Sequence, residues 1–190
     1  AAYHNGYLYL GDNCAIRRLA LQSPWHVDTI LGQQGNCAGL DGTGGSALLG
    51  RFLGLQVAGD TLYVTDTDNA ALRRVDVSNP ALPYSIVTAA GALGAPGVVD
   101  ATGTAARFGA PFAVTFDGKS LFIGDRSLLR QVDPATMRVT TLAGRLGCHS
   151  NIDGDHTRAA FNAGGGLAYL PSTGNLYWTD LNENVIREIR

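Results

Sequence analysis

Four stretches of this chain share one frame of apolar residues that ends in aspartate. Each is followed, after a short turn, by a second stretch in which apolar residues flank arginine. The first set is residues 7–12, 61–66, 120–125 and 175–180, and the second is residues 16–19, 72–75, 129–132 and 186–189. Short runs of this kind, rich in β-branched and aromatic residues and bounded by turn residues, predict β-strands.

Two further apolar stretches complete each unit. One ends at glycine (residues 30–32, 87–91 and 139–144), and the other follows a glycine-rich insertion (residues 55–58, 112–116 and 166–170). Each unit therefore predicts four short strands with an insertion before the next unit. In chain order they are strands A to D, which in the second unit are residues 55–58, 61–66, 72–75 and 87–91. No window keeps a helical period, and short helical turns are expected only in the insertions, at residues 45–49 and 104–107. The predicted class is all-β.

The repeat length points to an architecture. The aspartates that end the first stretches stand at positions 12, 66, 125 and 180, so successive copies are 54, 59 and 55 residues apart. Tandem four-stranded antiparallel units protect their sheet edges by packing radially, as the blades of a β-propeller do.

The motifs resemble those of the NHL-repeat β-propeller family, in its long-insert form of about 55 residues. The resemblance rests on Asp41-Gly-Thr-Gly44 with Arg51-Phe52, on Leu62–Asn69 and on Leu72-Arg-Arg-Val75, and it covers essentially the whole chain. It implies a propeller that usually closes with six blades. We expect residues 1–190 to form one such region of about three and a half to four blades, within a larger propeller; a four-bladed ring lacking one strand is the alternative. The expected blade units are residues 1–52, 53–108, 109–161 and 162–190, the last of them incomplete.

The repeated polar residues are interpreted as structural. A carboxylate at the end of strand B can accept hydrogen bonds from the turn that follows, and an arginine on strand C can pair with it, within one blade or between blades. A ring of carboxylates binding a cation is the alternative. The residues concerned are Asp12, Asp66, Asp125, Asp180, Arg17, Arg73, Arg130 and Arg187.

A phenylalanine also recurs in each insertion. Phe52, Phe108 and Phe161 are expected to fill the apolar gap between adjacent blades, where a buried aromatic ring contributes on the order of 2–3 kcal/mol.

Residues that do not repeat are the better candidates for chemistry. The third insertion gathers His149, Asp153, Asp155 and His156 next to Cys148, all of them competent zinc ligands, but the spacing fits no standard site and a polar loop is the alternative. The Asp41-Gly-Thr-Gly44 phrase likewise lacks the oxygen ligands of an EF-hand loop.

Three cysteines permit one disulfide. Cys14 lies in the first B–C turn and Cys37 in the first insertion, which emerge on one face of the sheet. A bridge between them needs Cα atoms within about 7 Å. It would join the insertion to its own blade and leave Cys148 free or paired elsewhere.

Composition narrows the function classes. The formal net charge is −2, and 16% of residues are charged, which gives no broad basic field for nucleic acid. No apolar run reaches the roughly 18–20 residues of a membrane helix, so no direct membrane insertion is expected. No cofactor fingerprint is found in the sequence. Low charge, a single lysine (Lys119) and the disulfide favour an extracellular or cell-surface location, although the compartment is not determined.

These observations favour a non-catalytic interaction or scaffold module whose partners are proteins or other domains of the same protein. The family resemblance also implies an alternative, a lyase or hydrolase that holds a metal in the central channel. The predicted inner strands, residues 55–58, 112–116 and 166–170, carry no His, Asp or Glu. Such an enzyme would need metal ligands from other blades.

Overall fold

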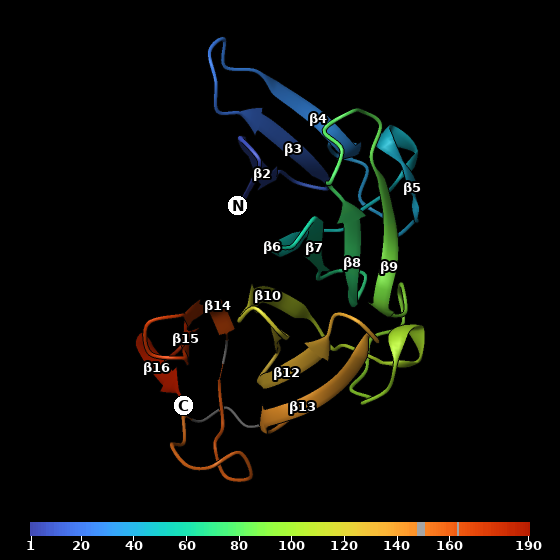
Figure 1. Ribbon diagram of the computed structural model, residues 1–190. Helices are drawn as coiled ribbons and strands as arrows, with labels where there is room; N and C mark the ends of the chain where they lie inside the picture. The colour runs from blue at the N-terminus through green and yellow to red at the C-terminus, as the bar shows by residue number, and fades with distance from the viewer. Residues whose placement is uncertain (148–150, 163) are drawn as a thin grey trace.

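The chain folds into four antiparallel sheets, and in each of them the consecutive main strands form a meander. Figure 1 shows the sheets following one another around an arc, with the first (blue) and the last (red) at its two ends. The computed structural model describes residues 1–147, 151–162 and 164–190, without the side chains of Phe52 and Leu53.

The strand bounds follow the sequence repeat. Sheet 1 contains β1 (Ala2–His4), β2 (Tyr7–Gly11), β3 (Ala15–Ala20) and β4 (Val27–Gly32). Sheet 2 contains β6 (Phe52–Ala58), β7 (Thr61–Asp66), β8 (Ala71–Asp76) and β9 (Ser85–Gly91), with β5 (Gly42–Thr43) at its outer edge. Sheet 3 contains β10 (Pro111–Phe116), β11 (Leu121–Asp125), β12 (Leu128–Asp133) and β13 (Arg138–Gly144). Sheet 4 contains β14 (Gly164–Leu170), β15 (Asn175–Asp180) and β16 (Val185–Ile189).

The first strand of each sheet is the innermost. Strand β10 lies against both β6 and β14, and β6 also contacts β1 and β2. This is the arrangement of β-propeller blades, so the predicted all-β propeller is confirmed. We call β4, β9 and β13 the outer strands.

Three buried apolar clusters fill the spaces between neighbouring sheets. The first joins sheets 1 and 2, the second joins sheets 2 and 3, and the third joins sheets 3 and 4. In the third cluster the fully buried ring of Trp178 stacks on Phe161, with ring centroids 4.6 Å apart, and meets the edge of Phe112. Much of the apolar core therefore lies between neighbouring sheets.

Each insertion crosses to the sheet that follows it. Strand β5, from the insertion after sheet 1, pairs with β9 of sheet 2. In the same way the amide of Val139 on β13 donates to the carbonyl of Ala101, in the insertion after sheet 2. The outer edges of sheets 2 and 3 are thus covered by the preceding unit.

The insertions contain the helical turns expected there. These are the single 3-10 turns η1 (Gly44–Ser46) and η2 (Gly103–Ala105), which begin one residue before the predicted stretches. Both begin at a glycine with positive φ, +54° at Gly44 and +57° at Gly103, a conformation that costs glycine little. Within the described residues, no helix is of the length and apolarity needed to cross a membrane.

Candidate functional site

Asp66 and Arg73 form a fully buried ion pair in sheet 2. Asp66 ends β7, and its Oδ2 lies 2.8 Å from an Nη of Arg73 on β8; both side chains are 0% exposed. The other carboxylate oxygen accepts from the amide of Gly50 and from the side chain of Asn69. The pair therefore joins strands B and C and also fastens the end of the insertion.

The second Nη of Arg73 reaches the preceding unit. It donates to the Leu40 carbonyl, at 3.0 Å, and lies 2.9 Å from the carboxylate of Asp41. That carboxylate accepts in turn from the amide and hydroxyl of Thr88 on β9. Arg73 thus connects the middle of sheet 2, its outer strand and the insertion that crosses it.

Sheet 3 repeats this network. Arg130, also fully buried, pairs with Asp125 at 2.9 Å and with Asp100 of the preceding insertion at 2.9 Å. Asp100 accepts from the amide and hydroxyl of Thr141 on β13, as Asp41 does from Thr88. The network recurs because the sequence unit recurs.

The end sheets carry partial copies. In sheet 1, Arg17 pairs with Asp12 at 3.2 Å, but the two side chains are 37% and 39% exposed. In sheet 4, Arg187 donates to the Ile152 carbonyl and to the carboxylate of Asp153. Asp180, at the end of β15, accepts from the amides of Asn162 and Glu183. These contacts support the predicted structural role of the repeated residues, which stays a prediction.

Burial and hydrogen bonding shift the pKa of the buried carboxyl groups in opposite directions. Burial raises the pKa of Asp125, against the amides of Ala110 and Gly109 and the charge of Arg130. Burial likewise raises the pKa of Asp66, against Asn69 and Arg73. Hydrogen-bond donors and the paired arginines thus oppose the rise in the pKa of both carboxyl groups.

The recurring phenylalanines lie next to the arginines. The ring centroid of Phe108, which is fully buried, is 5.3 Å from the guanidinium carbon of Arg130, and Phe161 is 5.0 Å from that of Arg187. Both rings belong to the clusters between sheets. The side chain of Phe52 lies outside the described part of the chain. The gap-filling role stays a prediction, which a substitution at Phe108 can test.

The structure contains the predicted disulfide. Cys14 and Cys37 are bonded, with Cα atoms 5.1 Å apart. Cys14 is fully buried, and Cys37 lies at the start of the first insertion. The bridge therefore ties that start to sheet 1, while the later part of the insertion, at β5, lies on sheet 2.

Removing this bridge should destabilise the fold. For a loop of this size, C14A/C37A is expected to lower the free energy of unfolding by about 3 kcal/mol, because the unfolded chain gains freedom. Denaturant unfolding measures the difference. Under reducing conditions the wild type and the variant should unfold at the same denaturant concentration; a difference that persists would contradict this account.

The proposed metal ligands of the third insertion have other partners where they are described. Asp153 binds Arg187, and Asp155 accepts from the amides of Thr157 and Arg158 and from the Thr157 hydroxyl. The exposed His156 makes no metal-competent group of three with the neighbouring described residues. Cys148 and His149 lie outside the described residues.

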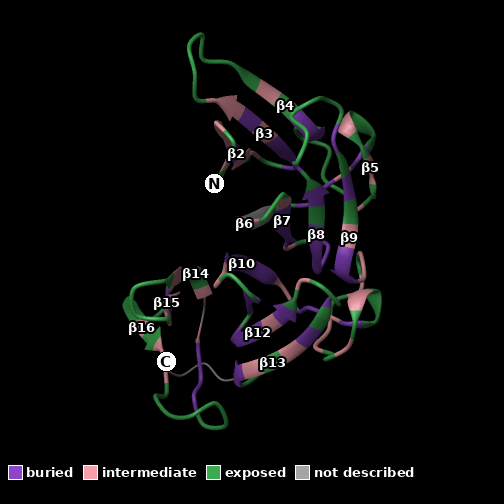
Figure 2. Ribbon diagram, in the orientation of Figure 1, coloured by how far each residue is buried: buried purple, intermediate pink, exposed green. Residues whose placement is uncertain are grey.

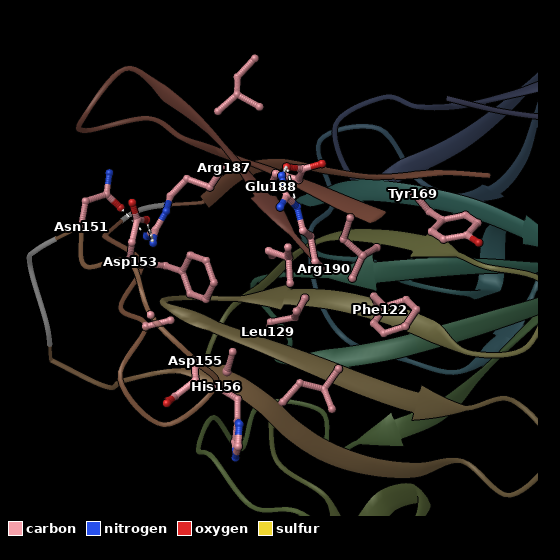
Figure 3. Close-up of a pocket in the computed structure, with 18 of the residues that line it drawn as sticks. Phe122, Leu129, Asn151, Asp153, Asp155, His156, Tyr169, Arg187, Glu188 and Arg190 are labelled. Carbon is pink, nitrogen blue, oxygen red and sulfur yellow. Dashed lines mark hydrogen bonds and ion pairs between the residues drawn. The ribbon is translucent and has the colours of Figure 1, made fainter. Parts of the chain in front are cut away.

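A cavity of about 1160 Å³ opens beside this insertion, between sheets 3 and 4. Figure 3 shows Asn151, Asp153 and Arg187 gathered at one end, and Phe122 and Leu129 along the sheet 3 wall. Glu188 and Tyr169 come from sheet 4, and Arg190 directly follows β16. The cavity thus has an apolar wall and a polar rim.

Sequence reasoning missed the roles of Asp41, Asp100 and the two threonines. The signal was available: Asp41, Asp100 and Asp153 keep the repeat spacing, as do Thr29, Thr88 and Thr141. It could not be interpreted because each aspartate binds an arginine more than 25 residues later, on the next sheet.

The amino-acid sequence is similar to those of two known proteins that share one name. The chain is 31% identical over 132 residues to NHL repeat-containing protein 2 from Bos taurus, a match covering 66% of this chain and 18% of that protein. The Homo sapiens protein of the same name matches at 30% identity over the same length. The chain thus spans less than a fifth of these relatives. No family model matches it.

Solved structures share the fold. An auxiliary nutrient binding protein from Bacteroides thetaiotaomicron superposes with a TM-score of 0.78 at 23% identity, over 98% of this chain and 45% of that one. Glutaminyl cyclase from Myxococcus xanthus superposes with a TM-score of 0.53 at 14% identity, over 100% of this chain and 70% of that one. At these identities the likeness concerns the fold alone.

Proposed function

We propose that this chain, which is an NHL-repeat β-propeller, is a non-catalytic protein-interaction or scaffold module. In this proposal residues 1–190 form a single region of a larger propeller, and the partners are proteins or other domains of the same protein. One structural observation carries the proposal. The repeated charged side chains pair with groups of the protein itself, whereas the insertions expose apolar side chains.

The buried charges have internal partners. Arg73 and Arg130 are 0% exposed, and each binds two carboxylates and at least one carbonyl of the protein itself. Charges held in this way contribute to the positions of neighbouring strands. They are not presented to a substrate.

The insertions instead expose the residue before the recurring aspartate. Leu40, Val99 and Ile152 occupy this same place in successive units and are 51%, 46% and 43% exposed. The repeat therefore places an apolar side chain of similar size on the insertion of each unit. Apolar side chains at the protein surface are common anchors in protein interfaces when they lie at the centre of a contact.

Matched triple variants can test this role. Once a protein partner has been identified by cross-linking and purified, L40S/V99S/I152S is expected to weaken its binding by about tenfold or more. The control is L21S/L82S/L170S, which removes three exposed apolar side chains that lie outside the insertions, two in the turns after β3 and β8 and one at the end of β14. It should leave the dissociation constant within about twofold.

Two results would overturn the proposal. One is equal binding by the two triple variants. The other is a stoichiometric bound metal ion in the purified protein together with lyase or hydrolase turnover.

A further inference from the structure

Four strand ends of sheet 3 meet where the insertions leave and enter it. Pro111 of β10 lies opposite Asp125 of β11. Asp125 lies opposite Leu128 of β12, which lies opposite Gly144 of β13. Neighbouring strands are about 5 Å apart, so these ends lie within about 15 Å of one another. We call this end, with the insertion residues bound to it, the sheet 3 insertion face: residues 99–100, 107–110, 125–128 and 144–147.

Two exposed arginines lie side by side on this face. Arg126 directly follows Asp125, and Arg145 directly follows Gly144. The hydroxyl of Ser127 donates to the carbonyl of Arg145, at 2.9 Å, and so joins the two loops. Both positive charges therefore belong to one surface.

A third arginine reaches the same face from the preceding insertion. Arg107 stands two residues before Gly109, whose amide donates to the carboxylate of Asp125 at 2.8 Å. A Cβ atom on Gly109 would come within 2.7 Å of the Arg126 side chain, so Arg126 lies against this segment. The guanidinium of Arg107 donates to two backbone carbonyls of its own insertion, which hold it without neutralising its charge.

The charges of this face are not balanced. Among the described residues, none of these three arginines takes part in an ion pair. The other charged side chains here are the buried Arg130 and the two aspartates that it binds, Asp100 and Asp125. Four arginines therefore stand against two aspartates, and the excess positive charge is on the exposed side.

The same end of sheet 2 is different. Its charged side chains pair with one another, and aspartates outnumber arginines there: Asp41, Asp66, Asp68, Arg51 and Arg73. The formal net charge of the whole chain is −2. The positive charge of the sheet 3 insertion face is therefore local, and it does not follow from the sequence repeat.

Two exposed apolar side chains lie beside the arginines. Val99 is 46% exposed and forms an isolated bridge with Arg107, in which both backbone hydrogen bonds are present. Leu146, which directly follows Arg145, is 55% exposed. Figure 2 shows β10 and β12 mainly buried, so the loops provide the exposed surface of this face. They combine positive charge with apolar contact area.

We propose that the sheet 3 insertion face binds an acidic segment of the protein partner, in which an apolar side chain lies between carboxylates. The guanidinium groups of Arg126 and Arg145 donate to the carboxylates, which they match in charge and in planar geometry. Val99 and Leu146 contact the apolar side chain. The inference rests on the proposed function, because Val99 is one of the insertion side chains assigned there to the partner.

Nucleic acid would be attracted by the same charges, but the face lacks the features that nucleic acid uses. Single strands bind by stacking their bases on exposed aromatic rings. The one aromatic residue among the residues of this face is Phe108, which is fully buried. Duplexes need many phosphate contacts along a broad basic surface, and this face has three arginines. An acidic protein segment with apolar side chains matches both of its components.

A synthetic peptide can represent the partner segment. We would titrate the 190-residue protein with a fluorescein-labelled peptide of sequence SELEELES and follow fluorescence anisotropy. The expected result is saturable one-to-one binding. R126Q/R145Q should weaken it about tenfold, because two exposed charge-assisted hydrogen bonds are lost. L146S should weaken it about threefold or more, through the lost apolar contact.

The matched control is R74Q/R138Q. It also removes two exposed arginines, from β8 and from the start of β13, both away from the insertion face. It should bind within about twofold of the wild type, and a peptide with lysine in place of each glutamate should not bind. At about 1 M salt, where charges are screened beyond about 3 Å, R126Q/R145Q should differ from the wild type by less than about threefold.

The inference and the proposed function can fail separately. If the partner found by cross-linking is weakened by L40S/V99S/I152S and not by R126Q/R145Q, the proposed function stands and this inference is wrong. The absence of peptide binding at millimolar concentration, or equal weakening by R74Q/R138Q, would also overturn it. Tighter binding of a labelled oligouridylate than of the acidic peptide would assign the face to single-stranded RNA instead.

Discussion

Replacing Arg130 with methionine is expected to lower the free energy of unfolding by about 3–5 kcal/mol, the usual effect of removing one partner from a buried ion pair. Asp125 and Arg130 are both fully buried, 2.9 Å apart. Without the guanidinium, the buried carboxylate keeps the amides of Gly109 and Ala110 as its donors among the described residues. Asp100 and the Val99 carbonyl also lose a donor, so the insertion loosens from sheet 3.

The equivalent pair of sheet 1 provides the control. Arg17 and Asp12 are both more than a third exposed, so R17M should change the free energy of unfolding by no more than about 1 kcal/mol. Urea unfolding of the two variants measures the contrast. Equal losses would show that the arginines stabilise the protein by a route other than the buried pair.

The pH dependence of R130M gives a second, independent readout. Burial raises the pKa of Asp125, and the charge of Arg130 opposes that rise, so the pKa should rise further in the variant. A carboxyl group whose pKa is higher in the folded state contributes stability at low pH, and this contribution is lost as the pH rises through the folded-state value. The deficit of R130M relative to the wild type should therefore be smaller at about pH 5 than at about pH 8.

Replacing Phe108 with alanine in the wild-type protein should lower the free energy of unfolding by about 3–5 kcal/mol, the range for truncating a fully buried aromatic residue. The ring lies in the cluster between sheets 2 and 3, next to the guanidinium of Arg130. A Cβ atom on Gly91 would come within 2.9 Å of it, so little free space surrounds the ring on that side. The cavity left by the truncation would therefore separate two sheets, and their contact would be weakened.

The control for this prediction is Tyr3, an aromatic residue that is 63% exposed on β1. The variant Y3A should change the free energy of unfolding by about 0.5 kcal/mol, as expected for a surface position. Thermal and urea unfolding should give the same order of the two variants. If F108A were as mild as Y3A, the recurring phenylalanine would not be a packing element between sheets.

The sequence predicted those parts of the fold that depend on neighbours in the chain. Asp66 and Arg73 are seven residues apart, on consecutive strands, so their pairing follows from the B–C turn. Cys14 and Cys37 could be placed on one face from the order of the strands. The participation of Asp41 could not be predicted, because an insertion of ordinary glycine-rich sequence does not indicate which sheet it will cover. Packing between sheets determines which sheet the insertion covers. This packing places Asp41 beside Thr88, which lies 47 residues later in the chain.

Because each insertion binds to the sheet that follows it, the units of the protein are stabilised in a fixed order during synthesis. The insertion after sheet 1 is held by Arg73 and Thr88, and the one after sheet 2 by Arg130 and Thr141. A nascent chain that has just completed an insertion therefore lacks the residues that will fasten it. Each of these insertions is bound only once the following sheet has formed. During synthesis, the most recently made unit is therefore the one most exposed to proteases and to misassembly.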